Sequence, residues 1–258
     1  MDRTRSAIFD GQTMNAVQIL CPAKLTLSLK VKGRRRDGYH LIDAEMVSVD
    51  LCDELIIAKG SGLTVRSTDS GFKVPLGDNN LINQALKLVN RTADVTLIKK
   101  IPAGAGLGGG STNAAGILRW AGFEDPIAAA NLGADVAFCL NGGRARVTGI
   151  GETLEHLPYH HQEITLLTPP LGVSTVDVYR AWDALDGPVG ENGNDLEAAA
   201  LSVEPELAEW RDALSGATGQ KARLAGSGGT WFVEGHHDPF IYRGVASVNV
   251  TTLPAQHP

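Results

Sequence analysis

The sequence has few cysteines and no long apolar run, and each absence excludes a class of protein. Only Cys21, Cys52 and Cys139 are present among 258 residues. An odd number of widely spaced thiols gives no disulfide framework, so we expect a reducing compartment, the cytoplasm. We interpret the thiols as buried apolar side chains rather than a catalytic group. No apolar segment approaches the ~20 residues that cross a bilayer, so we expect no membrane contact.

Basic residues are also in short supply. Lys and Arg number 23 against 29 Asp and Glu, which gives a formal net charge of −6. Proteins whose main partner is nucleic acid carry basic surfaces, so we expect no nucleic-acid partner. The 43% hydrophobic and 20% charged residues are ordinary for a globular enzyme that acts on small molecules. Both a monomer and a homodimer stay open.

The chain lacks internal repeats and strict strand–helix alternation, which indicates an α+β fold rather than a doubly wound sheet. The polar stretch 156–163 is a candidate domain boundary. We therefore expect a polar N-terminal extension over 1–16, in which Met14 is a second candidate start, an N-terminal domain over 17–157 and a C-terminal domain over 158–258. Patterning predicts strands at 17–32, 44–58 (a pair), 62–67, 95–101, 144–155, 164–168, 221–225, 229–234 and 245–251, and helices at 80–89, 112–120, 126–133, 175–185, 194–202 and 204–215.

The most informative segment is the glycine-rich run at 101–115, IPAGAGLGGGSTNAA. Such a run buries little apolar area and is costly to order, so it is typical of places where backbone N–H groups must approach an anion. A predicted strand precedes it and a predicted helix follows it. The helix N-terminus, with its unpaired N–H groups, would then face phosphate. This context disfavours the alternative of a flexible linker.

The same run matches the dinucleotide fingerprint G-x-G-x-x-G at 104–109, with Glu124 about twenty residues on. We reject that interpretation because Lys99, Lys100 and Pro102 interrupt the preceding strand, whereas a Rossmann first strand is apolar on both faces. The run is not a Walker A loop either, since no Gly-Lys-Ser/Thr follows. A nucleotide triphosphate held by backbone amides and hydroxyls fits better.

Three further segments carry candidate chemistry. Lys24 lies in an otherwise apolar strand at 22–27, Asp135 lies among small and apolar residues at 133–138, and a second glycine-rich turn occupies 225–230. Each has an ordinary structural alternative. The lysine could lie at a strand edge, the aspartate could cap a helix or form a turn, and the glycines could form a plain hairpin turn.

Taken together, the four segments resemble the GHMP kinase superfamily, which combines a PAK-type strand, a PxxxGLGGGS phosphate loop and a late GSGGT loop. The RDGYH, LGADV and NDLE segments at 36–40, 132–136 and 194–197 are similar to the branch that phosphorylates a cytidylylated methylerythritol in the non-mevalonate isoprenoid pathway. The resemblance covers roughly residues 17–233. It implies a two-domain α+β fold, with an N-terminal domain like ribosomal protein S5 domain 2 and a ferredoxin-like C-terminal domain.

The resemblance also implies roles for individual residues. Asp135 would accept the proton of the substrate hydroxyl, and Lys24 would stabilise the developing charge. Mg²⁺ would bridge the ATP phosphates, with Ser111 as the candidate side-chain ligand. Tyr39 and Tyr179 would sandwich the cytosine ring, whose edge His40 would read. The candidate ATP-binding residues are Asn80, Leu81, Lys99, Pro102, Ala103, Gly104, Ala105, Gly106, Leu107, Gly108, Gly109, Gly110, Ser111 and Thr112, and the candidate substrate-binding residues are Thr26, Tyr39, His40, Thr175, Tyr179 and Gly228.

Other features have plainer interpretations, and some depart from the family. The arginines at 34–36 could meet the substrate diphosphate, but a solvated basic loop is the stronger interpretation. The histidine pairs at 160–161 and 236–237 lack the spacing of a metal site. Thr26 stands where the family usually has Asn, and 113–133 is short by about ten residues. The remaining alternatives are another small-alcohol kinase, such as a homoserine kinase, and a nucleotide-binding module that has lost catalysis.

Overall fold

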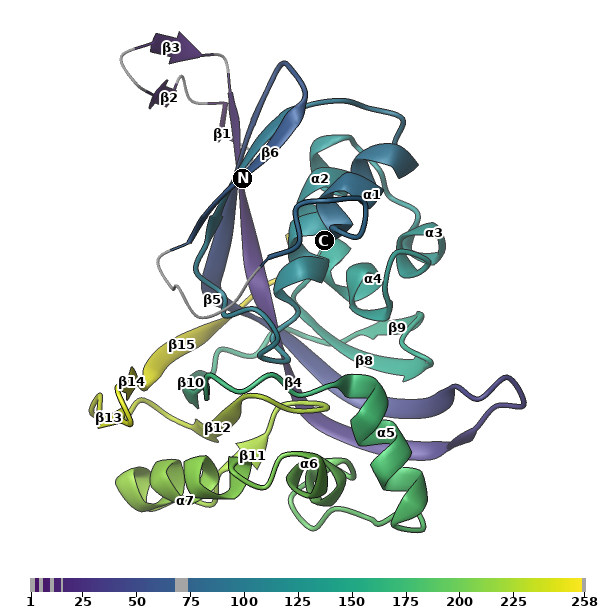
Figure 1. Cartoon of the computed structure of the whole chain (residues 1–258), viewed down its shortest axis with the longest axis vertical. Coiled ribbons are helices and arrows are strands. Elements are labelled where there is room, and N and C mark those ends of the chain that lie inside the picture. The colour runs from purple at the N-terminus through teal and green to yellow at the C-terminus, as the bar shows by residue number, and fades with distance from the viewer. Residues whose placement is uncertain (1–2, 5–6, 10–11, 15, 68–73, 257–258) are drawn as a thin grey trace.

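The computed structural model describes residues 3–4, 7–9, 12–14, 16–67 and 74–256. Figure 1 shows a long sheet that runs through the whole molecule, with helices packed against it at both ends. The strands are β1 (Arg3–Thr4), β2 (Ala7–Phe9), β3 (Gln12–Met14), β4 (Val17–Arg34), β5 (His40–Ala58), β6 (Gly62–Ser67), β7 (Asp94–Lys99), β8 (Arg144–Gly149), β9 (Thr153–His156), β10 (Glu163–Leu167), β11 (Arg223–Leu224), β12 (Trp231–Glu234), β13 (Ile241–Tyr242), β14 (Val245–Ala246) and β15 (Val248–Leu253). The helices are α1 (Leu81–Leu88), α2 (Gly109–Trp120), α3 (Pro126–Ala130), α4 (Ala134–Asn141), α5 (Thr175–Ala184), α6 (Glu197–Val203) and α7 (Leu207–Thr218).

The hairpin of β4 and β5 is the backbone of the sheet. The two strands have 18 and 19 residues and pair antiparallel along most of their length. The main sheet follows the order β1-β4-β5-β15-β10-β12-β11, and β7 and β8 also pair with β5. The prediction of two strands within 44–58 was wrong, because β5 continues through that range as one strand. The C-terminal strand β15 pairs with both β5 and β10 and so joins the two ends of the sheet.

A register shift in β4 decides which way its side chains face. The shift falls between Pro22 and Ala23, where the partner strand runs from Cys52 back to Val49. Such irregularities re-aim side chains and tolerate proline. Before the shift, Cys21 packs into the larger core. After it, Ala23 and Leu25 pack into a second core, together with residues of β10, β12 and β15. The alternation along the strand then turns the intervening side chain, that of Lys24, to the opposite face.

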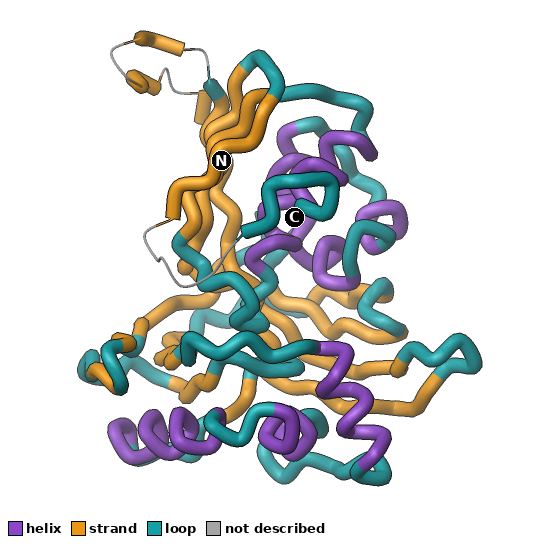
Figure 2. The backbone as a smooth tube through the Cα atoms, viewed as in Figure 1, coloured by secondary structure: helices purple, strands orange, loops and turns teal. Residues whose placement is uncertain are grey.

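The helices cover the sheet in two groups. In Figures 1 and 2, α1 to α4 lie against one face of the upper part of the sheet, α6 and α7 lie below the lower strands, and α5 crosses the β4–β5 hairpin in the view. Side-chain caps begin three of them: Asn80 accepts a hydrogen bond from the N–H of Ile82 at α1, Asp125 accepts two from the N–H groups of Ile127 and Ala128 at α3, and Ser174 accepts one from the N–H of Asp177 at α5. All six predicted helices are present, with ends shifted by up to three residues, and α4 is additional. The predicted boundary at 157/158 lies between β9 and β10, and the division into domains stays a prediction.

The packing of α2 on β4 and β5 can be tested with two matched Gly→Ala substitutions. A Cβ on Gly116 of α2 would lie 2.6 Å from Cys21 Sγ and 2.8 Å from Leu55 Cδ1. A Cβ on Gly216 of α7 would have nothing within 4 Å. Overpacking a core costs about 1–3 kcal/mol, whereas Ala replaces Gly in a helix with a gain of up to about 1 kcal/mol. Denaturant unfolding should therefore show that Gly116→Ala is less stable than the native protein and Gly216→Ala slightly more stable. Equal gains in both variants would contradict the close contact of α2 with the sheet.

Candidate active site

The glycine-rich loop connects β7 to α2 and has the geometry of an anion-binding turn. Gly104, Gly106 and Gly108 have φ angles of 75°, 76° and 67°, in the left-handed region that only glycine adopts freely. Gly108 is the N-cap of α2 and offers no side chain to the first-turn amides. The N–H groups that follow lack partners within the helix, as at every helix N-terminus, and favour a negative charge. The backbone of the loop therefore offers unpaired N–H groups to an anion, and its role in binding phosphate stays a prediction.

The second glycine-rich segment, at 225–230, packs against this loop. It joins β11 to β12 as a hairpin connection, so the ordinary alternative also holds. A Cβ on Gly106 would lie 2.2 Å from the carbonyl oxygen of Gly228, so the two backbones touch directly. The hydroxyl of Thr230 donates a hydrogen bond of 2.8 Å to the carbonyl oxygen of Ala105. The C-terminal part of the chain thus contacts the glycine-rich loop directly, through Gly228 and Thr230.

Asp53 of β5 is fully buried, and its carboxylate forms hydrogen bonds at the start of the glycine-rich loop. Its Oδ1 accepts hydrogen bonds from the backbone N–H groups of Lys100 and Ile101, at 2.7 and 2.8 Å. Its Oδ2 accepts one from the Asn113 amide of α2, at 2.9 Å, and forms an ion pair with Lys99. One carboxylate therefore ties together β5, the end of β7, the start of the loop and the first turns of α2.

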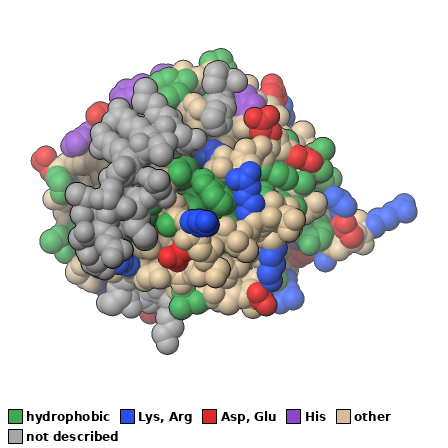
Figure 3. Space-filling view, turned by 90° about the horizontal axis from the view of Figure 1, so that it is seen from above, with side chains coloured by type: hydrophobic (Ala, Val, Ile, Leu, Met, Phe, Trp, Pro, Cys, Tyr) green, Lys and Arg blue, Asp and Glu red, His purple; other side chains and the backbone are tan. Residues whose placement is uncertain are grey.

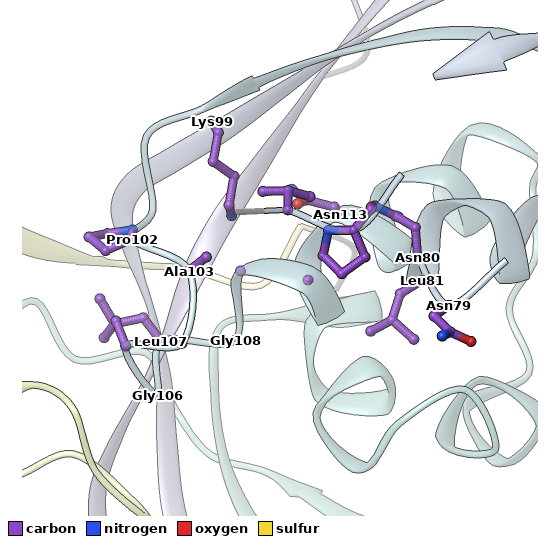
Figure 4. A pocket seen from close by; sticks show the side chains of 16 residues that line it. Asn79, Asn80, Leu81, Lys99, Pro102, Ala103, Gly106, Leu107, Gly108 and Asn113 are labelled. Atoms are coloured by element: carbon purple, nitrogen blue, oxygen red, sulfur yellow. The ribbon is translucent and has the colours of Figure 1, made fainter. Parts of the chain in front are cut away.

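A cavity of about 240 Å³ lies along the loop and is the candidate nucleotide pocket. Figure 4 shows side chains from four segments around it: Lys99 from β7, Asn80 and Leu81 from the start of α1, Asn113 from α2, and Pro102 from the loop. The predicted ATP-binding residues at 102–110 line the cavity, as do Asn80, Leu81 and Lys99. Ser111 does not line it but lines the second cavity described below, and Thr112 is buried in the interior. Asn79, Val74 and Pro75 also line it, although no sequence pattern singled them out.

A second cavity, of about 600 Å³, contains the ion pair predicted to act on the substrate. Lys24 Nζ lies 3.0 Å from Asp135 Oδ2. Lys24 is 6% exposed, whereas the side chain of Asp135 is 30% exposed in the first turn of α4. A Cβ on Gly108 would lie 3.2 Å from Lys24 Cε and 3.9 Å from Asp135 Oδ2, so the pair stands directly beside the N-terminus of α2. Neither ordinary alternative, an edge lysine or a capping aspartate, describes this pair of a buried lysine and a partly exposed aspartate.

Aromatic side chains from the tip of the β4–β5 hairpin and from α5 line the other end of this cavity. The ring of His40 stacks on Tyr179, with centroids 4.7 Å apart and an interplanar angle of 21°. Burial, with a smaller contribution from the Asp135 carboxylate, raises the pKa of Tyr179 to about 12, so its phenol stays neutral. Tyr39 lines the same cavity but is 61% exposed. The ring of Tyr179 therefore stacks on His40 and not on Tyr39.

Two carboxylate contacts here escaped sequence reasoning. His40 Nε2 lies 2.7 Å from Asp183 Oδ1, and Arg34 lies 3.1 Å from Asp183 Oδ2. Asp183 lies four residues after Tyr179 on α5, a spacing that puts both on one helix face and that could have suggested it. Thr26 and Thr175 line the cavity as predicted. Gly228 does not, because it packs on Gly106 while its neighbour Ser227 lines the cavity.

The three thiols and the histidine pairs at 160–161 and 236–237 line neither of these two cavities. Burial raises the pKa of Cys21 and Cys139 to about 12 and that of Cys52 to about 11, so none is a thiolate near neutral pH. Within the described ranges, no three His, Cys, Asp or Glu side chains group as a metal site would require.

The described helices include none long and apolar enough to cross a bilayer. On the face in Figure 3, Lys and Arg side chains are interspersed with Asp and Glu.

Comparisons with known proteins agree with this geometry. The sequence model of the GHMP kinases N terminal domain matches residues 80–143, from the cap of α1 to the end of α4. A 4-diphosphocytidyl-2-C-methyl-D-erythritol kinase of Paracoccus denitrificans (strain Pd 1222) is 38% identical over 230 residues, which cover 82% of this chain and 84% of that protein. A kinase of the same name from Bacillus pumilus (strain SAFR-032) is 34% identical over 248 residues, which cover 82% and 85%.

Solved structures show the same fold. A crystal structure of a 4-(cytidine 5'-diphospho)-2C-methyl-D-erythritol kinase superposes with a TM-score of 0.70 and 29% identity, over 91% of this chain and 98% of that one. A homoserine kinase from Cytophaga hutchinsonii superposes with a TM-score of 0.60 at 16% identity, over 97% and 98%, which shows likeness of fold alone. The predicted α+β GHMP kinase fold is therefore confirmed.

The role of Asp53 can be tested by removing its charge. Asp53→Asn would leave the buried Lys99 cation without its carboxylate and would turn an amide N–H toward other donors. Removing one partner of a buried pair costs about 3–5 kcal/mol. Denaturant unfolding should show a loss of that size, and Asp53→Asn with Lys99→Met should recover part of it. Asp78→Asn, at an exposed ion pair with Lys87, is the control and should leave the midpoint unchanged. An unchanged midpoint for Asp53→Asn would remove this carboxylate as the anchor of the loop.

Proposed function

This chain belongs to the 4-diphosphocytidyl-2-C-methyl-D-erythritol kinases, within the GHMP kinases, and we propose that it transfers the γ-phosphoryl group of ATP to the 2-hydroxyl group of that cytidylylated alcohol. The observation that carries the proposal is the Lys24–Asp135 pair, 3.0 Å apart, beside the N-terminus of α2. A base, a cation and a phosphate-binding turn meet at one point, between one cavity suited to a nucleotide and another suited to an alcohol.

Phosphoryl transfer to an alcohol gives Lys24 and Asp135 different roles. A tertiary alcohol is a crowded, weak nucleophile, so its proton must pass to a base as the O–P bond forms. The partly exposed carboxylate of Asp135 takes that proton, and the ammonium of Lys24 stabilises the negative charge that develops on the transferred group. Because Lys24 is buried at 6% exposure, water screens its charge less than at the surface. Lys24 also holds the Asp135 carboxylate in one orientation.

The nucleotide occupies the cavity along the loop. The γ-phosphate lies on the first-turn amides of α2, and the adenine end lies between Asn80, Leu81 and Lys99. Mg²⁺ is commonly held by substrate phosphates and one or two protein groups. Ser111, which lines the alcohol cavity at the turn, would supply the protein oxygen. The ion, when bound, neutralises phosphate charge.

The cytosine end of the substrate occupies the aromatic end of the larger cavity. Tyr39 and Tyr179 supply aromatic faces for the ring, and His40 meets its polar edge. This end separates the proposal from a homoserine kinase, whose small substrate has no ring to stack. The retained Lys24–Asp135 pair argues against a module that has lost catalysis. A coupled assay that follows ADP release with ATP and the cytidylyl alcohol, against ATP and homoserine, tests the proposal directly.

The base is tested by Asp135→Asn, which keeps the size and polarity of the side chain but cannot take a proton. General-base loss costs about 10²–10⁴-fold in rate, so kcat should fall by that factor. ATP affinity, measured by calorimetry, should change little because the carboxylate does not line the nucleotide cavity. Asp238→Asn, at an exposed carboxylate that lines neither cavity, is the control. Turnover near the native rate in Asp135→Asn would exclude Asp135 as the base.

The stacking role of Tyr39 is tested by Tyr39→Ala. The side chain is 61% exposed, so its removal should hardly alter the free energy of unfolding. Base–aromatic stacking is worth about 1–3 kcal/mol, so the Kd of the cytidylyl substrate and of CDP should rise about five- to a hundredfold. The Kd of ATP should stay unchanged, since Tyr39 lies at the far end of the second cavity. If CDP at millimolar concentration does not raise the thermal midpoint of the native protein, the chain has no cytosine pocket.

A further inference from the structure

We propose that Asp183 is a positioning residue that fixes which nitrogen of His40 carries the proton, and that this choice makes the site prefer cytosine to uracil. The inference rests on the proposed function and deepens it, because it concerns how the same cavity selects its substrate. Asp183 was not among the residues predicted from the sequence. The fold brings it to His40 from 143 residues away along the chain.

The contact defines the hydrogen-bonding character of the imidazole. His40 Nε2 lies 2.7 Å from Asp183 Oδ1, and the His40 side chain is only 8% exposed. A carboxylate can only accept, so Nε2 must be the donor. In the neutral ring the proton is then on Nε2, and Nδ1 is left as an acceptor. The second oxygen of Asp183 lies 3.1 Å from Arg34 Nη1, and this contact keeps the carboxylate turned toward the ring.

The ring has little freedom to exchange its two nitrogens. One face of His40 stacks on Tyr179, and Trp182 meets the ring nearly at right angles, with centroids 5.6 Å apart. A flip of the ring would break the only hydrogen bond that it makes within the described part of the chain, at Nε2. Nδ1 has no partner among the described residues, and His40 lines the larger cavity. An acceptor nitrogen without a protein partner, on a residue that lines a cavity, is free to accept a hydrogen bond from a ligand or from water.

The two pyrimidines differ in what they would offer to this nitrogen. Cytosine carries an exocyclic amino group, a donor, at the position where uracil carries a carbonyl oxygen, an acceptor. An acceptor at Nδ1 pairs with the amino group of cytosine. It would face the carbonyl oxygen of uracil with no proton between them, which leaves two buried acceptors unpaired. Sites that reject a ligand by leaving buried polar groups unpaired discriminate strongly.

The experiment compares two ways of removing the Asp183 acceptor with a matched control on the same helix. Asp183→Asn supplies an amide N–H that can donate to Nε2 and stabilise the other tautomer, and Asp183→Leu removes the acceptor altogether. Asp177→Asn alters an exposed α5 carboxylate that pairs with Arg180 and lines neither cavity. Calorimetry on the full chain measures the Kd of CMP, UMP and ATP for each protein, and ¹⁵N spectra report which nitrogen of His40 is protonated.

We expect the native protein and Asp177→Asn to bind CMP at least about tenfold more tightly than UMP, with Nε2 of His40 protonated and Nδ1 free. In at least one Asp183 variant the ratio of the two Kd values should fall about tenfold, with ATP affinity unchanged. A merely structural role would weaken CMP and UMP equally in both variants, and an unchanged ratio would overturn the inference, as would a proton on Nδ1 in the native protein. Failure of the native protein to bind CMP would instead overturn the proposed function, and the inference with it.

Discussion

The buried carboxylate of Asp53 is the contact on which the geometry of the site depends. A carboxylate with no exposure to water is stable only when its charge is compensated, and Asp53 is compensated by Lys99, by Asn113 and by two backbone N–H groups. Those donors belong to the end of β7, the start of the glycine loop and α2. The loop is too rich in glycine to fix its own conformation, so its shape comes from such fixed ends. The orientation of the α2 N-terminus follows from them.

Residues distant in sequence complete the site. The carbonyl oxygen of Gly228 and the hydroxyl of Thr230 support the loop from the C-terminal part of the chain, while β15 ties that part to β5. The register shift at Pro22 turns Lys24 toward α4, where Asp135 stands in the first turn. The pair therefore depends on a strand irregularity and a helix position that are independent of each other. A one-residue change in either would separate Lys24 from Asp135.

Much of the fold could be predicted from the chain alone. The glycine loop between a strand and a helix, the helices at 80–89 and 175–185, and the α+β order all follow from local patterns and are present. The prediction of two strands within 44–58 failed because nothing local shows that β5 continues through Asp50 and Leu51. Neighbouring strands β4, β7, β8 and β15 decide its length, and these pairings are long-range.

By itself, the sequence determined which residue types are available: a glycine-rich run between a strand and a helix, Lys24 among apolar residues, and Asp135 among small and apolar residues. These are local choices of residue type, and local steric and solvation costs govern them. Only the tertiary structure decided which groups meet. It placed Ser111 in the cavity of Lys24 and Asp135 rather than in the cavity along the glycine loop, packed Gly228 on Gly106, and stacked His40 on Tyr179 with Asp183 bonded to the His40 ring. The last two contacts join segments more than a hundred residues apart in the sequence. These segments meet because two hydrophobic cores pack against the long β4–β5 hairpin.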